Sequence, residues 1–290
     1  HYFDVNEYPI GTPVSRQNIL FLKELNYYVK QADPDAILLT EVWTDASVVA
    51  KYYEGADSSF NFDLSDMIIE TINQGSDNSS IDLVGNLIKT RDAIKLIRSD
   101  FVDSVFLTNH DQERIMSQVA SIDKAKLAAN IMFTLPGVSW IYYGEELGMT
   151  GVNPHENIRQ PMIMNNEYQT SGRKTEELNG DNLNILPFNE MYDHYKMLIS
   201  VKDDAVMKYG DISEVEKNQR KLLSYVRNYG DEHYLVIHSL SALEQTIKLN
   251  QSFELVYDFG YASIISENII LPPFSSIVVA IENNEIEFLY

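Results

Sequence analysis

The sequence of 290 residues lacks cysteine, lacks long apolar segments and is poor in cationic side chains. Without cysteine, disulfides and thiolate metal sites are excluded, but the compartment stays open because secreted proteins also do without disulfides. No apolar run reaches the about 18 residues of a membrane-spanning helix, so we expect no membrane span. Lys and Arg number 22 against 43 Asp and Glu, a formal net charge of −21. Such a charge repels phosphate backbones and anionic lipid, so we expect no nucleic-acid partner.

Several familiar motifs are missing as well. The pattern G-x-S-x-G, a phosphate-binding loop and a dinucleotide fingerprint are all absent. The opening stretch "HYFDVNEYPIGTP" has neither an initiating Met nor the basic and apolar segments of a signal peptide. The chain is then either cut from something longer or a mature terminus left by processing, and composition favours neither.

With 44% hydrophobic residues, the chain can build a sizeable core. Ser15 can cap a helix over residues 16–32, which places Leu22, Leu25 and Val29 on one face. An apolar strand follows within a few residues, and the helix-then-strand order occurs at least three times. The expected helices cover residues 16–32, 81–97 and 123–135, and the strands 35–43, 104–111 and 139–144. Helices leading into fully apolar strands are typical of parallel α/β folds.

Each expected strand ends in polar residues. The ends supply Glu41 with Trp43, then Asn109-His110-Asp111, and then residues 143–146 with two glutamates. In parallel α/β folds the active site lies at the carboxyl ends of the strands. We therefore expect carboxylates from separate strands to converge on one rim.

The pattern changes after the first two thirds of the chain. Residues 144–184 are polar and predict a long functional loop, followed by a helix from about residue 189 to 201. Beyond it come short alternating or β-branched runs, which predict a small antiparallel sandwich. We expect an α/β domain over residues 1–204 and an all-β domain over residues 205–290.

Glu41 is a candidate general acid. A carboxyl group at a strand end, partly desolvated beside the ring of Trp43, would have its ionised form disfavoured and could hold a proton near neutral pH. The alternative is a solvated glutamate next to a core tryptophan.

His110 and Asp111 are the second candidate site. An ionised aspartate beside a neutral imidazole could stabilise a developing positive charge and bind sugar hydroxyls. Alternatively, Asp111 caps the next helix while His110 bonds a carbonyl, and Glu113 with Arg114 directly behind favours such a cap. The adjacent spacing of His110 and Asp111, without a second histidine nearby, does not indicate a metal site.

As a set, these segments resemble the alpha-amylase family, glycoside hydrolase family 13. "FLTNHDQERI" resembles the fourth conserved region of the family and "ILLTEVW" the third. "AANIMFTLPGVSWIYYGEELGMTG" is similar to the last barrel helix and strand, "ENIRQPM" to the loop after it, and "LPPFSSIVVA" to the final strands of the C-terminal domain. The resemblance covers nearly the whole chain in the right order.

The resemblance implies roles for particular residues. Glu41 would be the general acid/base, and Asp111 would stabilise the transition state and bind sugar hydroxyls. His110 would bind the sugar in the cleaved subsite, with Arg159 a nearby ligand. His1 would be the histidine that ends the motif of the nucleophile, so the nucleophile Asp would lie upstream of the chain. The remaining expected substrate-binding residues are Trp43 and Asn109.

The resemblance further implies the C-terminal half of a (β/α)8 TIM barrel, strands five to eight, followed by the sandwich. A half barrel exposes two sheet edges and part of its core, so a complementary N-terminal barrel segment is an expected partner. Calcium is possible as a cofactor, with ligands mostly outside this chain, and an extracellular location would suit starch.

The activity implied is retaining hydrolysis of alpha-1,4-glucosidic bonds in starch-like glucans, most like the bacterial alpha-amylases, with the isolated chain inactive. Alternatives within the family are an alpha-1,6-glucosidase and a transglycosylase. Outside catalysis, the chain could be a glucan-binding or scaffold relative, or a truncated fragment.

Overall fold

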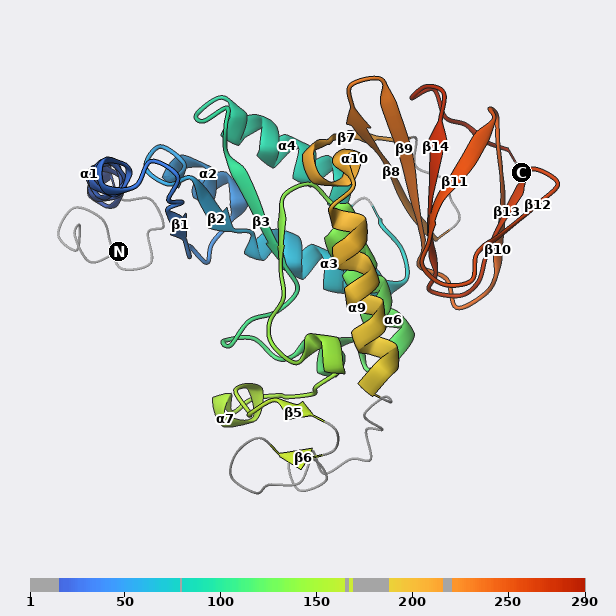
Figure 1. The fold of residues 1–290 in the computed structure, drawn as a ribbon, viewed down its shortest axis with the longest axis horizontal. Coiled ribbons are helices and arrows are strands. Elements are labelled where there is room, and N and C mark those ends of the chain that lie inside the picture. Colours follow the sequence, from blue (N-terminus) through green and yellow to red (C-terminus); the bar gives the residue numbers. More distant parts are fainter. Residues whose placement is uncertain (1–15, 79, 165–166, 169–187, 216–220, 290) are drawn as a thin grey trace.

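A computed structural model describes residues 16–78, 80–164, 167–168, 188–215 and 221–289. Figure 1 shows a parallel sheet with its helices at one end of the molecule and antiparallel sheets at the other. His1 and Ser15 lie outside the described residues. Among the described helices, none is both long and apolar enough to cross a membrane.

A parallel sheet of four strands carries the first domain, and its strands neighbour one another in chain order. They are β1 (Leu39–Thr40), β2 (Ser58–Phe60), β3 (Val102–Phe106) and β4 (Val138–Trp140). The connections contain α2 (Ala46–Tyr52), α3 (Phe62–Gln74), α4 (Leu83–Lys95), α5 (Ile115–Val119) and α6 (Ile122–Thr134). Parallel neighbours in chain order, joined by helices, are the arrangement of (β/α) barrels.

The remaining elements of this domain flank the sheet. They are α1 (Arg16–Ala32), the short 3-10 helix η1 (Glu145–Leu147), α7 (His155–Ile158), the paired strands β5 (Ile163–Met164) and β6 (Glu167–Tyr168), α9 (Phe188–Lys202) and α10 (Ala205–Tyr209). The helix expected near residues 189–201 is thus α9. The expected long loop carries η1, α7, β5 and β6 in its described part.

The helices α3 and α6 pack on one face of the sheet, and α9 packs on α6 (Figure 1). Local signals set their ends: the side chain of Asn61 accepts a hydrogen bond from the Leu64 amide at 3.1 Å, and α3 stops at Gly75 with φ of 67°. Ile131 and Met132 of α6 are fully buried. Each such side chain contributes roughly 1.5–3 kcal/mol of hydrophobic stabilisation.

The opposite face of the sheet carries aromatic rings that the described chain leaves open. Phe60 contacts Phe106 and Trp140, with ring centroids 5.4 and 5.3 Å away. Trp140 is 41% exposed and Val138 47%, although both belong to a sheet strand. In the described part of the chain, β1 and β4 each have one neighbouring strand, so the sheet has two open edges.

Helix α1 has the expected bounds, but its expected apolar face is not the buried one. Leu25 is 37% exposed, whereas Asn18, Ile19 and Asn26 are buried. The Asn26 side-chain amide donates to the Gly55 carbonyl at 3.0 Å. A Cβ on Gly55 would lie only 2.7 Å from the backbone nitrogen of Lys23, so the helix approaches the turn closely at this glycine. The helix therefore packs on a glycine turn through polar contacts and directs several apolar side chains outward.

Strand β2 and its helix α3 were not among the expected elements, because Ser58 and Ser59 do not look like core residues. Both are buried, since their hydroxyls find partners. Ser58 donates to the Val102 carbonyl at 2.7 Å, and Ser59 donates to the Thr40 carbonyl at 3.2 Å. A strand can thus be polar and buried when its hydroxyls bond to neighbouring strands.

Two antiparallel sheets form the C-terminal part of the chain. The first, in the order β11-β14-β9-β8-β7, comprises β7 (Asp211–Glu214), β8 (Leu222–Tyr229), β9 (Glu232–Ser239), β11 (Phe253–Asp258) and β14 (Ser276–Ile281). The second, β12-β13-β10-β15, comprises β10 (Gln245–Leu249), β12 (Ser263–Ile265), β13 (Asn268–Leu271) and β15 (Phe288–Leu289). Buried residues such as Ile237 and Ile269 pack between the sheets. The short alternating or β-branched runs of the sequence correspond to β8, β9, β10, β11 and β14, whereas β7, β12, β13 and β15 were not expected.

The first antiparallel sheet also packs on the helices of the barrel domain, so one core continues through both parts. Side chains alternate between the two faces along β8, and Tyr225 lies on the face toward the helices. Its hydroxyl lies 2.7 Å from Thr134 Oγ1 on α6. His238 bonds Ser276 Oγ at 2.7 Å, and burial lowers its pKa to about 3. The expected domain boundary after residue 204 stays a prediction; the first strand of the two C-terminal sheets begins at Asp211.

Candidate active site

The loop after β3 places three polar residues at the carboxyl end of the parallel sheet. The buried residues Leu107 and Thr108 extend beyond the strand, and Asn109, His110 and Asp111 then reach the surface. The side-chain oxygen of Asn109 accepts a hydrogen bond from the Asp111 amide at 2.8 Å. Such a local turn holds the backbone of the three residues in place without a helix.

Asp111 is the centre of a small charged cluster. Its carboxylate accepts from Arg159 Nη2 at 2.5 Å, and His110 Nε2 lies 3.4 Å away. Arg159 also donates through Nε to the His110 carbonyl at 2.9 Å. The structure therefore brings together Asn109, His110, Asp111 and Arg159, which are four of the residues singled out from the sequence.

Asp111 does not cap the following helix. Helix α5 begins at Ile115, its N-cap is Arg114, and the N-cap makes no side-chain hydrogen bond to the helix. The capping alternative is wrong, because the loop continues for several residues beyond Asp111 before the helix starts. The carboxylate is instead directed to Arg159 and remains 36% exposed, open to a ligand.

Glu41 and Trp43 follow the edge strand β1. The ring of Trp43 stacks on Phe62, with centroids 4.8 Å apart, yet is 58% exposed. Glu41 is exposed, so its expected partial burial beside Trp43 is not found. In the described part of the chain, no hydrogen bond or ion pair joins Glu41 to the Asp111 cluster. His1 cannot be placed because it lies outside the described residues.

Glu145 was expected at the rim with the other carboxylates, and this expectation is wrong. Its side chain is fully buried beneath the Asp111 loop and accepts the hydroxyl hydrogen of Thr108 at 2.9 Å. Neighbouring Glu146 turns back on its own loop and accepts from the Gly144 amide at 2.8 Å. Burial raises the pKa of the Glu145 carboxyl to about 8, so the group is protonated at neutral pH.

Protonation of Glu145 makes stability depend on pH. The folded protein binds this proton more tightly than the unfolded chain, so stability is fully present below about pH 4.5 and is lost toward about pH 8. This carboxyl should lower the free energy of unfolding by up to about 1.4 kcal/mol per pH unit between those limits. Glu145→Gln, which resembles the protonated form, should remove that slope in urea denaturation. If the free energy of unfolding changed with pH in the same way in both proteins, Glu145 would not be the source of the slope.

Arg114 is the buried residue near the site that sequence reasoning assigned only to a helix start. It is 0% exposed and donates from Nε to the Ile158 carbonyl at 2.9 Å and from Nη1 to the Tyr143 carbonyl at 2.7 Å. Its guanidinium carbon lies 4.6 Å from the ring centre of Tyr142. The signal in the sequence was an arginine directly before the apolar pair Ile115-Met116.

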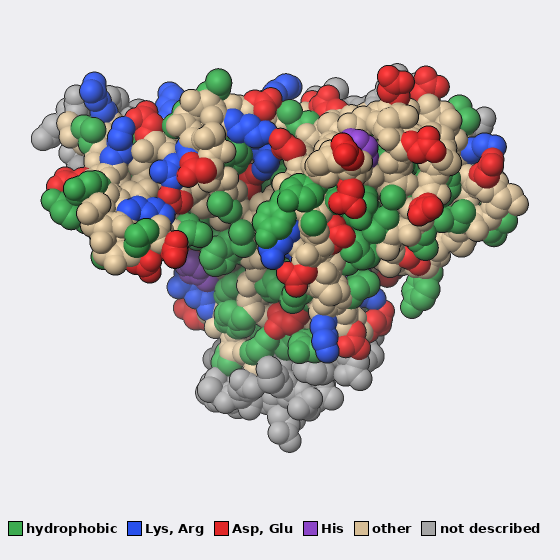
Figure 2. Space-filling model, turned by 45° about the horizontal axis from the view of Figure 1, so that its top comes forward, with side chains coloured by type: hydrophobic (Ala, Val, Ile, Leu, Met, Phe, Trp, Pro, Cys, Tyr) green, Lys and Arg blue, Asp and Glu red, His purple; other side chains and the backbone are tan. Residues whose placement is uncertain are grey.

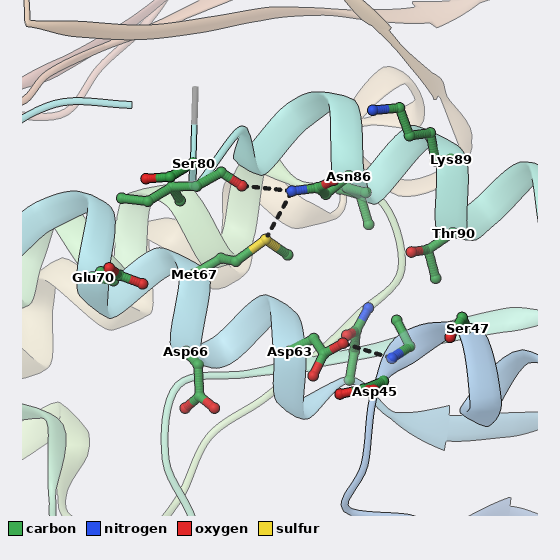
Figure 3. A pocket seen from close by; sticks show the side chains of 14 residues that line it. Asp45, Ser47, Asp63, Asp66, Met67, Glu70, Ser80, Asn86, Lys89 and Thr90 are labelled. Atoms are coloured by element: carbon green, nitrogen blue, oxygen red, sulfur yellow. Dashed lines mark hydrogen bonds between the residues drawn. The ribbon is translucent and has the colours of Figure 1, made fainter. Parts of the chain in front are cut away.

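A pocket of about 530 Å³ lies elsewhere, between α2, α3 and α4 (Figure 3). Asp63, Asp66 and Glu70 of α3 line one wall, and Lys89 of α4 stands on the other side. Burial raises the pKa of Asp63, whose carboxylate accepts from the Ala46 amide at 2.5 Å. None of the residues expected in the active site lines this pocket.

No metal centre is apparent in the described residues. Within them, no three His, Cys, Asp or Glu side chains are grouped closely enough to hold an ion. Figure 2 shows Lys and Arg interspersed with Asp and Glu on the face in view, without a broad cationic surface.

Comparison with known proteins identifies the family. A family model of the alpha-amylase catalytic domain matches residues 4–210. The chain belongs to the alpha-amylase family. A second model, the C-terminal domain of the alpha-amylase SusG, matches residues 222–278 of this alpha-amylase family chain.

Individual relatives agree with the family match. Alpha-amylase 3 of Dictyoglomus thermophilum is 36% identical over 279 residues, which are 91% of this chain and 55% of that protein. Alpha-amylase SusG of Bacteroides thetaiotaomicron is 27% identical over 256 residues, 82% of this chain and 37% of that protein. Further relatives are named cyclomaltodextrinase, 4-alpha-glucanotransferase and oligo-1,6-glucosidase.

Solved structures show the same fold. An alpha-amylase from H. orenii matches with a TM-score of 0.77 and 26% identity, covering 92% of this chain and 57% of that one. Together these comparisons support a TIM barrel followed by an all-β domain. The alpha-amylase family chain spans little more than half the length of Alpha-amylase 3 and of the H. orenii enzyme.

Proposed function

We propose that this chain is part of a retaining glycoside hydrolase that cleaves alpha-1,4-glucosidic bonds in starch-like glucans. The observation that carries the proposal is the cluster of Asp111, His110 and Arg159 at the carboxyl end of β3 in an alpha-amylase catalytic domain. A carboxylate, an imidazole and a guanidinium supply the donors and acceptors that a sugar ring needs, and the carboxylate can stabilise positive charge at the anomeric carbon.

In this mechanism, Glu41 protonates the glycosidic oxygen as the bond to the anomeric carbon breaks. A nucleophilic aspartate from outside this chain attacks that carbon and forms a covalent glycosyl-enzyme. Glu41 then removes a proton from water, which releases the sugar with its configuration retained. Retention requires the two carboxyl groups roughly 5–5.5 Å apart. Exposure of Glu41 suits a residue whose partner belongs to another segment.

The proposed missing part is a complementary barrel segment with the other half of the strands. The open edges β1 and β4 and the exposed ring of Trp140 are the surfaces that such a segment would cover. Covering them would bury backbone groups and apolar rings that otherwise face water. On this proposal strands β1 to β4 are barrel strands five to eight, and the isolated chain is inactive.

Other activities of the family differ in acceptor or linkage. A transglycosylase would pass the glycosyl group from the same covalent intermediate to a sugar, and an alpha-1,6-glucosidase would place a branch bond at Glu41. Relatives named cyclomaltodextrinase, 4-alpha-glucanotransferase and oligo-1,6-glucosidase are the reason to retain the transglycosylase and the alpha-1,6-glucosidase as alternatives. A non-catalytic scaffold would have no chemical need for Glu41 together with the Asp111 cluster. An extracellular location and calcium binding remain further proposals that rest on the family alone.

The stereochemistry of the product tests the proposed reaction. The protein together with the complementary segment should release the alpha-anomer from a malto-oligosaccharide. Proton NMR spectra recorded before mutarotation identify which anomer is formed first. Chain without the segment is the control and should release nothing. Initial beta-anomer would contradict retention, and transfer products without free reducing sugar would favour the transglycosylase.

A further inference from the structure

Two loops meet at the Asp111 cluster, and one buried residue joins them from beneath. Asp111 and Arg114 lie on the loop after β3, whereas Ile158 and Arg159 lie on the long loop after β4. Arg159 crosses to the first loop and bonds Asp111 and the His110 carbonyl. Arg114 crosses in the opposite direction and bonds the Ile158 carbonyl at 2.9 Å. Each loop thus contributes one arginine that bonds the other loop. The residue that Arg114 bonds, Ile158, directly precedes Arg159 in the chain.

Further contacts tie the same two loops together around Arg114. Its backbone amide donates to the Gly151 carbonyl at 2.9 Å, and the Gly151 amide donates to Ser117 Oγ at 2.9 Å. The second donor of the guanidinium bonds the Tyr143 carbonyl at the base of the long loop. Arg114 therefore connects the start of the long loop, at Tyr143, with its return, at Ile158.

The chemistry of these contacts requires an arginine. In the described part of the chain, the guanidinium bonds two carbonyls, stacks near the rings of Tyr142 and Tyr143, and forms no ion pair. The planar guanidinium of arginine can donate to two separate carbonyls and lie against aromatic rings at the same time, whereas the ammonium of lysine is a single point charge. Burying an unpaired charge is costly, so packing alone would favour an apolar side chain here.

We propose that Arg114 is a positioning residue, which fixes the backbone at Ile158 so that Arg159 stays bonded to Asp111 and His110. This inference rests on the proposed function, because Asp111 and Arg159 matter to turnover only in a sugar site. Arg159 is half-exposed and has a long side chain, so its placement depends on where its backbone is held. Misplacing a substrate-binding group by about 1 Å can reduce the rate about 10²-fold.

The test compares two buried arginines in the protein with its complementary segment. Arg227 is also 0% exposed and bonds backbone carbonyls, of Thr134, Met207 and Gly210, but lies at the junction with the C-terminal sheets. We expect Arg114→Lys to reduce kcat for malto-oligosaccharide hydrolysis about 10²-fold, and Arg227→Lys to leave kcat unchanged even if it lowers Tm equally. Combining Arg114→Lys with Arg159→Lys should cost no more than Arg159→Lys alone, because both changes remove one interaction.

Hydrogen exchange of the backbone amides provides a readout that does not need activity. Arg114→Lys should speed exchange in residues 155–160 relative to the rest of the protein, and Arg227→Lys should not. Equal exchange in both variants, equal kcat losses, or additive losses in the double variant would each overturn the positioning role. If the unmodified protein does not hydrolyse the sugar but the exchange difference is present, the proposed function is contradicted. The role of Arg114 in holding the backbone at Ile158 is then still supported.

Discussion

Glu41→Gln should abolish most glucan hydrolysis while leaving glucan binding intact. The amide keeps the size of the side chain and its hydrogen-bonding capacity but cannot give a proton to the glycosidic oxygen. Loss of general acid/base catalysis costs typically about 10²–10⁴-fold in rate. The measurement is kcat for a malto-oligosaccharide in the protein with its complementary segment, together with calorimetric binding of the same sugar.

A second exposed glutamate provides a control with the same change in charge. Glu54 is an exposed glutamate that pairs with Lys23, so Glu54→Gln should change neither kcat nor binding. Turnover of Glu41→Gln equal to that of Glu54→Gln would remove Glu41 from the mechanism. If the unmodified protein binds the sugar without turning it over, the scaffold alternative gains instead.

The polar ends of the strands were the part of the site that local sequence predicted best. The apolar run before Asn109 announces a buried strand, and the polar residues that follow it have to surface where the strand ends. For that reason the position of Asp111 and His110 beyond the strand end could be predicted without a structure. Their partner Arg159, almost fifty residues later, came from the family resemblance, because spacing alone does not show which loops meet.

The buried polar residues were the part that local sequence could not predict. Ser58 and Ser59 look like turn residues, yet they form a core strand because hydroxyl partners exist on both neighbours. Glu145 looks like a rim carboxylate, yet it is a protonated acid under Thr108. Partners far apart in sequence decide such cases, and a residue's own polarity carries no information about them.

The complementary segment that we propose would account for a further group of wrong expectations. Leu25 was expected on the apolar face of its helix and Glu41 in a partly desolvated site, yet both are exposed. Helix α1 and strand β1 stand at one end of the sheet, where the described chain offers nothing to cover them (Figure 1). An apolar pattern predicts that a face is covered in the working protein, and on our proposal the cover comes from the complementary segment.

A buried ion pair within the α/β domain, next to strand β7, is the second place where one substitution should have a large effect. Asp103 of β3 is buried and pairs with Arg91 of α4, which also bonds Asp211 of β7 at 3.1 Å. Burial raises the pKa of the Asp103 carboxyl, while Arg91 acts in the opposite direction. Burial also lowers the pKa of the nearby Lys202 ammonium well below its usual range. Asp103 is therefore the buried counter-charge of Arg91.

Asp103→Asn should destabilise the protein by about 3–5 kcal/mol, because it leaves Arg91, whose side chain is only 12% exposed, without its closest counter-charge. Asp211→Asn is the matched control: it removes the other carboxylate bonded to Arg91, but that side chain is 52% exposed. Its loss should cost about 1 kcal/mol or less, since water screens the pair. Urea denaturation of both variants measures the difference. Equal losses would mean that burial of Asp103 adds nothing to its pairing with Arg91.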